Sequence, residues 1–136
     1  PENRKDLLNA LNNGWVDCIA SHHFPQEWDS KTCEFEYAGY GMTGLETAFG
    51  VAGSAGISSE KWVELCSINP RKIFGLPQAE IHEGMPADMT LFLPDATYTF
   101  DEKQVRSKSK NSAFIGKELK GRIVGIVNGE KVFLNS

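Results

Sequence analysis

Cysteine is scarce in this chain of 136 residues, and its placement excludes two classes of protein. The cysteines are Cys18, Cys33 and Cys66, and no two of them have the Cys-x-x-Cys spacing of metal-binding or redox motifs. An odd number without close pairs argues against a disulfide framework and is typical of a reducing compartment. We therefore expect a cytoplasmic protein.

Long apolar runs and basic blocks are also missing. No run approaches the roughly twenty apolar residues that span a membrane, and we recognise no secretory signal peptide. The net charge is −4, and the most basic stretch, residues 103–110, is diluted by serines and predicts a solvated loop. These features predict that neither a membrane nor a nucleic acid is a partner.

The remaining composition is that of an ordinary globular domain. Hydrophobic residues make up 40% and charged residues 24% of the chain. This length is enough for one domain with a real core but not for two large ones. The first residue is Pro1 rather than an initiator methionine, which leaves open that the sequence belongs to a longer protein.

The chemistry is expected at the end of a short buried strand. Leucines at helical spacing predict a helix over residues 3–13, which ends at Gly14. The nearly continuous apolar run Val16–Ala20 then predicts a parallel strand covered on both faces. A polar cluster follows at residues 21–26, and the carboxyl end of such a strand is where α/β proteins place their functional residues. The loop from there to Met42 is long enough to indicate function or disorder.

Three helices are predicted next. The stretch Thr43–Glu46 matches a capping box, and the helix that it opens buries Phe49. Ser58 is predicted to cap a second helix whose Trp62 belongs to the core. An Asn-Pro pair is predicted to open a third, short helix over Pro70–Phe74, ended by Gly75.

From residue 77 the apolar period changes to two, which predicts an antiparallel sheet. The predicted strands are Ala79–His82, Met89–Leu93, Thr97–Phe100, Gly121–Val127 and Lys131–Leu134. The pair Asn128-Gly129 between the last two strands is a strong hairpin signal. The sequence thus predicts an α/β part over residues 1–75 and a sheet module after it, without an internal repeat.

Several motifs occur together in an order that resembles one enzyme family. They are Ala20-Ser-His-His-Phe-Pro-Gln26, the stretch Tyr37–Phe49 with its Gly-Leu-Glu-Thr-Ala, Asn69-Pro-Arg-Lys-Ile-Phe-Gly-Leu76, and the strands Gly84–Phe92 and Gly121–Val132. Together they resemble the C-terminal portion of the dihydroorotases, which are cyclic amidohydrolases. The resemblance covers essentially the whole chain.

The resemblance implies a fold. Residues 1–75 would be the last β/α unit of a (β/α)8 amidohydrolase barrel, and residues 76–136 part of an antiparallel β-sandwich domain. A complete barrel takes about 250 residues, so the chain would be a C-terminal fragment. The His-x-His pair, the carboxylated lysine and the two further histidines of the family's metal site would lie upstream.

The resemblance also implies the chemistry. The family interconverts N-carbamoyl-aspartate and dihydroorotate in pyrimidine biosynthesis with a hydroxide activated by zinc. His22 occupies the position of the family's catalytic, metal-binding aspartate, and Gln26 that of the histidine that holds the substrate carboxylate. Tyr40 and Gly41 fall where the family presents backbone groups to the substrate ring. A histidine can bind zinc and transfer protons near neutral pH, but one imidazole nitrogen cannot contact metal and hydroxide together.

Alternatives remain open at this point. The two replacements also suit a catalytically impaired homologue that is a structural partner of aspartate carbamoyltransferase, and another cyclic amidohydrolase, of the dihydropyrimidinase or allantoinase type, is the third possibility. The histidine pair would otherwise be a polar surface turn. We expect a dihydroorotase-like hydrolase, with a possible homo-oligomer or aspartate carbamoyltransferase as partner, and we expect the isolated 136 residues to be inactive.

Overall fold

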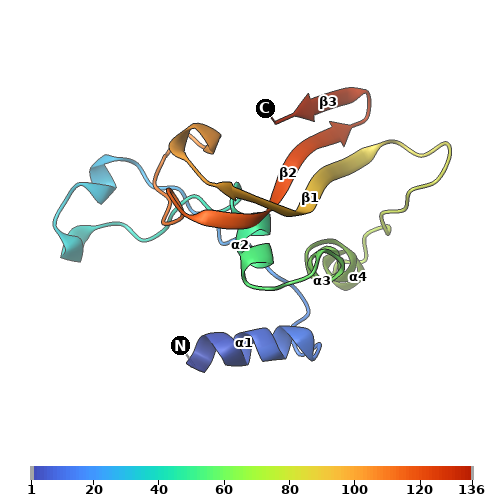
Figure 1. The fold of residues 1–136 in the computed structure, drawn as a ribbon, viewed down its shortest axis with the longest axis horizontal. Helices are drawn as coiled ribbons and strands as arrows, with labels where there is room; N and C mark the ends of the chain where they lie inside the picture. The colour runs from blue at the N-terminus through green and yellow to red at the C-terminus, as the bar shows by residue number, and fades with distance from the viewer. Residues whose placement is uncertain (1, 136) are drawn as a thin grey trace. The chain divides into compact units, whose positions relative to one another are not determined.

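The fold comes from a computed structural model, which describes residues 2–135 (Figure 1). The helices are α1 (Glu2–Asn12), α2 (Ala48–Ser54), α3 (Ser59–Val63) and α4 (Asn69–Ile73), with a π turn, η3 (Glu64–Ile68), and short 3₁₀ turns η1 (Asp29–Lys31), η2 (Phe35–Tyr37) and η4 (Glu102–Gln104). The strands are β1 (Asp88–Thr99), β2 (Glu118–Asn128) and β3 (Lys131–Leu134). The chain forms two compact units. In the described range, unit 1 comprises residues 2–20, 55–93 and 123–135, and unit 2 comprises residues 21–54 and 94–122.

The first helix of unit 1 confirms the prediction for residues 3–13. Gly14 has a φ of +74°, and the Trp15 N–H donates to the carbonyl of Ala10 at 2.9 Å. A left-handed glycine with this back-donation is the usual way to end a helix. No side chain of α1 is buried, so the helix packs weakly within the unit.

The strand predicted over Val16–Ala20 is wrong for this structure, in which the segment is irregular. A parallel strand needs a neighbouring strand to complete its hydrogen bonds, and no strand among the described residues pairs with it. Its backbone is bonded to a helix instead. The Ile19 N–H donates to the carbonyl of Leu65 at 3.1 Å, and the Asn69 amide donates to the carbonyl of Asp17 at 3.0 Å.

The helix bonded to residues 16–20 has an irregularity that explains why the Leu65 carbonyl can accept from Ile19. The helix predicted over Pro70–Phe74 is present as α4, but α3, η3 and α4 run without a break from Ser59 to Ile73, so Asn69 does not cap a separate helix there. The Asn69 N–H bonds back to Glu64 rather than to Leu65, and Pro70 has no N–H to offer. The carbonyl of Leu65 is thereby released from the helix and accepts from Ile19. A proline inside the helix thus creates a docking point for the N-terminal segment.

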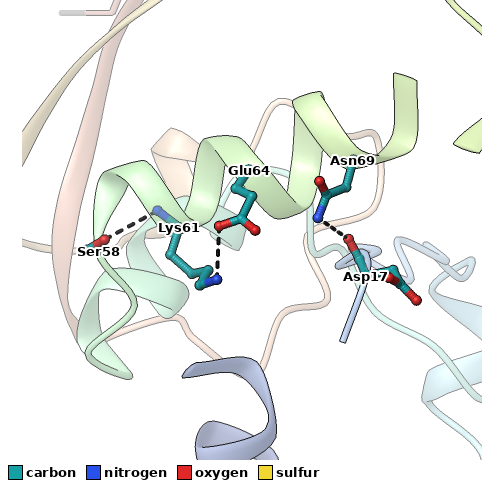
Figure 2. A network of polar contacts seen from close by, with 5 residues as sticks. All are labelled: Asp17, Ser58, Lys61, Glu64 and Asn69. Carbon is teal, nitrogen blue, oxygen red and sulfur yellow. Dashed lines mark hydrogen bonds and ion pairs between the residues drawn. The ribbon is translucent and has the colours of Figure 1, made fainter. Parts of the chain in front are cut away.

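A side chain caps the start of the same helix (Figure 2), and backbone groups close its end. Ser58 caps its start as predicted, since the serine hydroxyl oxygen accepts from the Lys61 N–H at 3.2 Å, and Lys61 also pairs with Glu64 at 2.9 Å. At the other end Gly75 has a φ of +65°, and the Leu76 N–H returns to Arg71 at 2.8 Å. The predicted stop at Gly75 is confirmed.

The sheet has three strands in the order β1-β2-β3, and β2 and β3 are antiparallel. Asn128 pairs with Lys131, so the predicted hairpin is confirmed, with Gly129 and Glu130 as its two turn residues. The strand predicted at Ala79–His82 is wrong. The predicted break at Pro94 is also wrong, because β1 lies at the edge of the sheet, where a proline removes no ladder bond.

The core of unit 2 contains buried apolar side chains from strands and loops. Phe100, Val105 and Leu119 form a buried cluster, against which Val51, Tyr98 and Phe114 pack. Phe49 of α2 is buried as predicted. In unit 1, Leu65 is completely buried, whereas Trp62, predicted as core, is only half-buried. Among residues 2–135 there is no helix whose length and apolarity would let it span a lipid bilayer.

Candidate functional site

The predicted site residues belong to two chain segments that lie side by side in unit 2. We call residues 21–26 the signature segment and residues 39–45 the return segment. The Phe24 N–H donates to the carbonyl of Met42 at 3.1 Å, and the Gly39 N–H donates to Ser30 at 2.9 Å. Residues predicted from separate motifs, Gln26 and Gly41 among them, are therefore brought together by backbone hydrogen bonds.

Two glycines allow this close approach. Gly41 has a φ of +113°, and a Cβ atom on it would lie 2.3 Å from the backbone oxygen of Phe24. A Cβ on Gly39 would lie 2.9 Å from the side-chain oxygen of Gln26. The Gly41 contact is with fixed backbone and its φ is positive, so the return segment needs glycine there, whereas at Gly39 the Gln26 side chain could move aside.

His22 has a left-handed backbone. Its φ is +49°, and its side chain is exposed. Asparagine, aspartate and histidine adopt this conformation more readily than other residues with a side chain. The aspartate of the family signature and the histidine of this chain are thus both compatible with the same backbone, although their chemistry differs.

His23 has a structural role that the sequence did not indicate. Its Nδ1 accepts the N–H groups of Gly44 at 3.0 Å and Leu45 at 3.2 Å. A ring nitrogen that accepts two hydrogen bonds carries no proton, so the proton of the neutral ring lies on Nε2. His23 therefore joins the signature segment to the end of the return segment, and the adjacent histidines have different environments.

Gln26 lies on the wall of a cavity of about 940 Å³. The cavity is lined on one side by residues 25–28 and Lys31, and on the other by Glu102, residues 107–112 and Ile115. Tyr40 is outside this lining, and its side chain is 93% exposed. The structure thus brings Gln26 to a cavity, whereas the side chain of Tyr40 is exposed and lies outside it.

A third segment, which we call the latch loop (residues 105–112), completes the site, and sequence reasoning had described it only as a solvated loop. Its Ser107 donates to the Oε1 of Glu46 from both the backbone, at 2.9 Å, and the hydroxyl, at 2.5 Å. Its Asn111 is bonded to Gly41 and Thr43. The one available signal was the density of serine and asparagine, which commonly bond to nearby backbone.

These bonds overturn the predicted capping box. The Thr43 hydroxyl donates to the carbonyl of Asn111 at 3.2 Å, and the Glu46 carboxylate accepts from Ser107. Neither side chain therefore caps the following helix, which begins at Ala48. Burial by itself raises the pKa of Glu46, but the hydrogen bonds from Ser107 and the backbone lower that pKa below its ordinary value. Glu46 is therefore an anion, and its Oε2 is buried without a partner among the described residues.

The described residues do not form a metal site by themselves. Within residues 2–135 no three histidine, cysteine, aspartate or glutamate side chains are grouped closely enough to hold a metal ion. A catalytic zinc ion takes about three protein ligands, so His22 could supply only part of such a set. A zinc site at His22 is accordingly not formed by this segment alone.

Comparisons with known proteins show that the chain is similar to a part of known dihydroorotases and hydantoinases. No family model matches it. It is 36% identical over 138 residues to a dihydroorotase of Chlorobaculum tepidum, which covers 98% of this chain and 31% of that protein. It is also 37% identical over 138 residues to a dihydroorotase of Clostridium acetobutylicum, covering 97% of this chain and 32% of the relative. The chain spans about a third of the length of these relatives and corresponds to a C-terminal part of them.

Solved structures agree on the fold. An L-hydantoinase (dihydropyrimidinase) from Arthrobacter aurescens matches 95% of this chain and 31% of its own, with a TM-score of 0.76 and 28% identity. A D-hydantoinase (dihydropyrimidinase) from Thermus sp. matches 96% of this chain and 31% of its own, with a TM-score of 0.80 and 23% identity, and so shows the fold alone. The chain has the α/β fold of the C-terminal part of amidohydrolases, with a small sheet.

Proposed function

We propose, from the homology to the C-terminal part of dihydroorotases, that this chain is a segment of a dihydroorotase-type cyclic amidohydrolase. The enzyme would interconvert N-carbamoyl-aspartate and dihydroorotate. The observation that carries the proposal is the identity to curated dihydroorotases, 36% over 98% of this chain in one relative and 40% over 86% in another. In this proposal residues 1–75 are the end of a (β/α)8 barrel and residues 76–136 a segment of a β-sandwich domain.

We assign binding of the substrate ring to the return segment. No hydrogen bond from the N–H groups of Tyr40 and Gly41 occurs within residues 2–135, although the backbone on both sides is bonded. Two N–H groups on a fixed backbone suit the carbonyl and carboxylate oxygens of a cyclic amide acid. Gln26, at the cavity wall, would donate its side-chain amide to the substrate carboxylate.

His22 is assigned the proton transfer. Its exposed imidazole follows the signature position, and an ordinary histidine changes charge near neutral pH. Zinc, when bound in the complete enzyme, would activate the attacking water, and the other ligands would come from outside this chain. If His22 instead binds that metal, another group must transfer the proton, because one imidazole nitrogen cannot contact metal and hydroxide together. Cytoplasmic location and association with a second copy or with aspartate carbamoyltransferase remain predictions.

The test uses the complete protein that carries this segment, supplied with zinc. We expect it to open dihydroorotate and to leave dihydrouracil, hydantoin and allantoin unchanged, because these lack the ring carboxylate. His22→Asn should lower kcat about a hundredfold or more, since general acid–base groups contribute at least that much. Asparagine is chosen because it tolerates the left-handed backbone that His22 adopts.

Two outcomes would contradict the proposal. Failure of the zinc-loaded complete protein to open any cyclic amide would remove the assigned activity. An unchanged kcat in His22→Asn, with dihydroorotate still hydrolysed, would leave the activity standing but reject the role of His22. As a control, Glu36→Gln changes an exposed residue of η2 and should leave kcat unaltered.

A further inference from the structure

The return segment is held by the latch loop at three hydrogen bonds to one residue. The Asn111 side-chain amide donates to the backbone carbonyl of Gly41 at 3.1 Å. The Asn111 carbonyl accepts the Thr43 N–H at 2.9 Å and the Thr43 hydroxyl at 3.2 Å. Thr43 is only 1% exposed, so these bonds are shielded from competing water.

The latch loop is itself ordered by its own polar groups. The Ser109 hydroxyl oxygen accepts the Asn111 N–H at 3.3 Å, and the Lys110 ammonium donates to the carbonyl of Val105 at 2.5 Å. Val105 is buried in the core of unit 2. Asn111 is therefore presented by a loop with a fixed base, which is the condition for a side chain to position another segment.

The bonds bracket the groups that the proposed function assigns to the substrate. Gly39 is tied to Ser30 on one side, and Gly41, Met42 and Thr43 are tied on the other. The Tyr40 and Gly41 N–H groups lie between these ties. The Asn111 amide holds the carbonyl of the peptide between Gly41 and Met42. This bond restricts rotation about the Gly41 backbone, on which the direction of the preceding N–H groups depends.

We propose that Asn111 is a positioning residue that aims the Tyr40 and Gly41 N–H groups at the substrate, so that the latch loop is part of the active site. This inference rests on the proposed function. Asn111 itself does not touch the reacting atoms. It fixes the peptide of Gly41, a residue whose lack of a side chain leaves its backbone otherwise free to rotate. If the Gly41 backbone were free to turn, the preceding peptides, which carry the Tyr40 and Gly41 N–H groups, would also change direction, and misplacement by about 1 Å is costly to catalysis.

The test compares Asn111→Asp with the wild type in the complete, zinc-loaded protein. Aspartate has the same size but cannot donate to the Gly41 carbonyl and places a negative charge beside it. We expect KM for dihydroorotate to rise about five- to tenfold, as for loss of one hydrogen bond, while kcat changes less than about twofold. Lys117→Gln is the matched control, because Lys117 is an exposed residue of the same unit outside the latch loop, and it should leave both constants unchanged.

Hydrogen exchange gives a second readout that does not depend on activity. In Asn111→Asp the Thr43 amide should exchange at least about tenfold faster than in the wild type, and in Lys117→Gln at the wild-type rate. Unchanged exchange in Asn111→Asp would overturn the latch itself. Faster exchange with an unchanged KM would overturn the link to substrate. If the wild type is inactive, the proposed function fails and exchange alone decides whether Asn111 holds the return segment.

Discussion

The two units of this chain differ in how their residues are fixed. In unit 2 the core of Phe100, Val105 and Leu119 lies under segments that are cross-linked by side-chain-to-backbone hydrogen bonds. In unit 1 the buried apolar residue is Leu65, and all four residues of β3 are exposed. The candidate site lies in unit 2, so the residues proposed to do chemistry belong to the unit with the larger buried apolar core. Rigid support is what positioned groups require.

Replacing one buried side chain in each unit gives the largest expected effect on this comparison. Phe100→Ala should cost about 3–5 kcal/mol and Leu65→Ala about 2–5 kcal/mol, the range for large-to-small core changes. Hydrogen exchange should show faster exchange of the Thr43 amide in Phe100→Ala and of the Ile19 amide in Leu65→Ala. Loss of protection at both amides in both variants would show that the units do not unfold separately.

A pair of glycines separates crowding from backbone conformation. Gly41 in unit 2 and Gly14 in unit 1 both have positive φ, but a Cβ on Gly14 would meet nothing within 4 Å. Gly14→Ala should cost about 1 kcal/mol, the penalty of a left-handed alanine. Gly41→Ala should cost at least about 2 kcal/mol, because its Cβ would also overlap the Phe24 carbonyl. Equal shifts in the denaturant midpoint would contradict this crowding.

Acid should weaken unit 2 through Glu46. The pKa of Glu46 is lowered from its ordinary 4.5 on folding, so the carboxylate stabilises the folded state above that pH. The contribution is lost as the pH falls through the lowered pKa. Glu46→Gln should lower the unfolding free energy by about 1–2 kcal/mol at neutral pH and flatten its decline below pH 4.5. Glu118→Gln, at an exposed residue of the same unit, should retain the wild-type pH profile.

The smallest effect is expected from a helix cap in unit 1. Ser58→Ala removes the acceptor for the Lys61 N–H and should cost about 1 kcal/mol. Thermal unfolding followed by circular dichroism measures it, with Ser58→Asp as a control that keeps a capping oxygen. A loss in Ser58→Asp as large as that in Ser58→Ala would show that the cap is not the cause.

Local signals in the sequence predicted local structure well. The stop at Gly14, the cap at Ser58 and the turn after Asn128 each depend on neighbours within a few residues, and all three are present. The resemblance to dihydroorotases also rested on contiguous motifs, and the relatives confirm it. Local hydrogen bonds at caps and turns can be predicted from a single sequence because the bonded residues are close together in the chain.

Long-range pairing was not predictable in the same way. Thr43 and Glu46 have the spacing of a capping box, but residues more than sixty positions away took both side chains. The Val16–Ala20 segment has strand composition, yet its partner here is a helix carbonyl released by Pro70. For the site, the motifs implied that the signature and return segments belong together. They gave no sign that the latch loop binds the return segment. When tertiary packing decides a hydrogen-bond partner, the local sequence around either residue does not reveal the pairing.

The bond between Thr43 and Asn111 spans 68 residues, and this separation bears on how the protein is made. During synthesis, the return segment leaves the ribosome well before the latch loop that fixes it. Closing so long a loop costs entropy before any contact repays it, so this step is expected late in folding. Until then the cavity beside the signature segment lacks the wall formed by the latch loop. A nascent or truncated chain ending before residue 111 should therefore be unable to bind a ligand there.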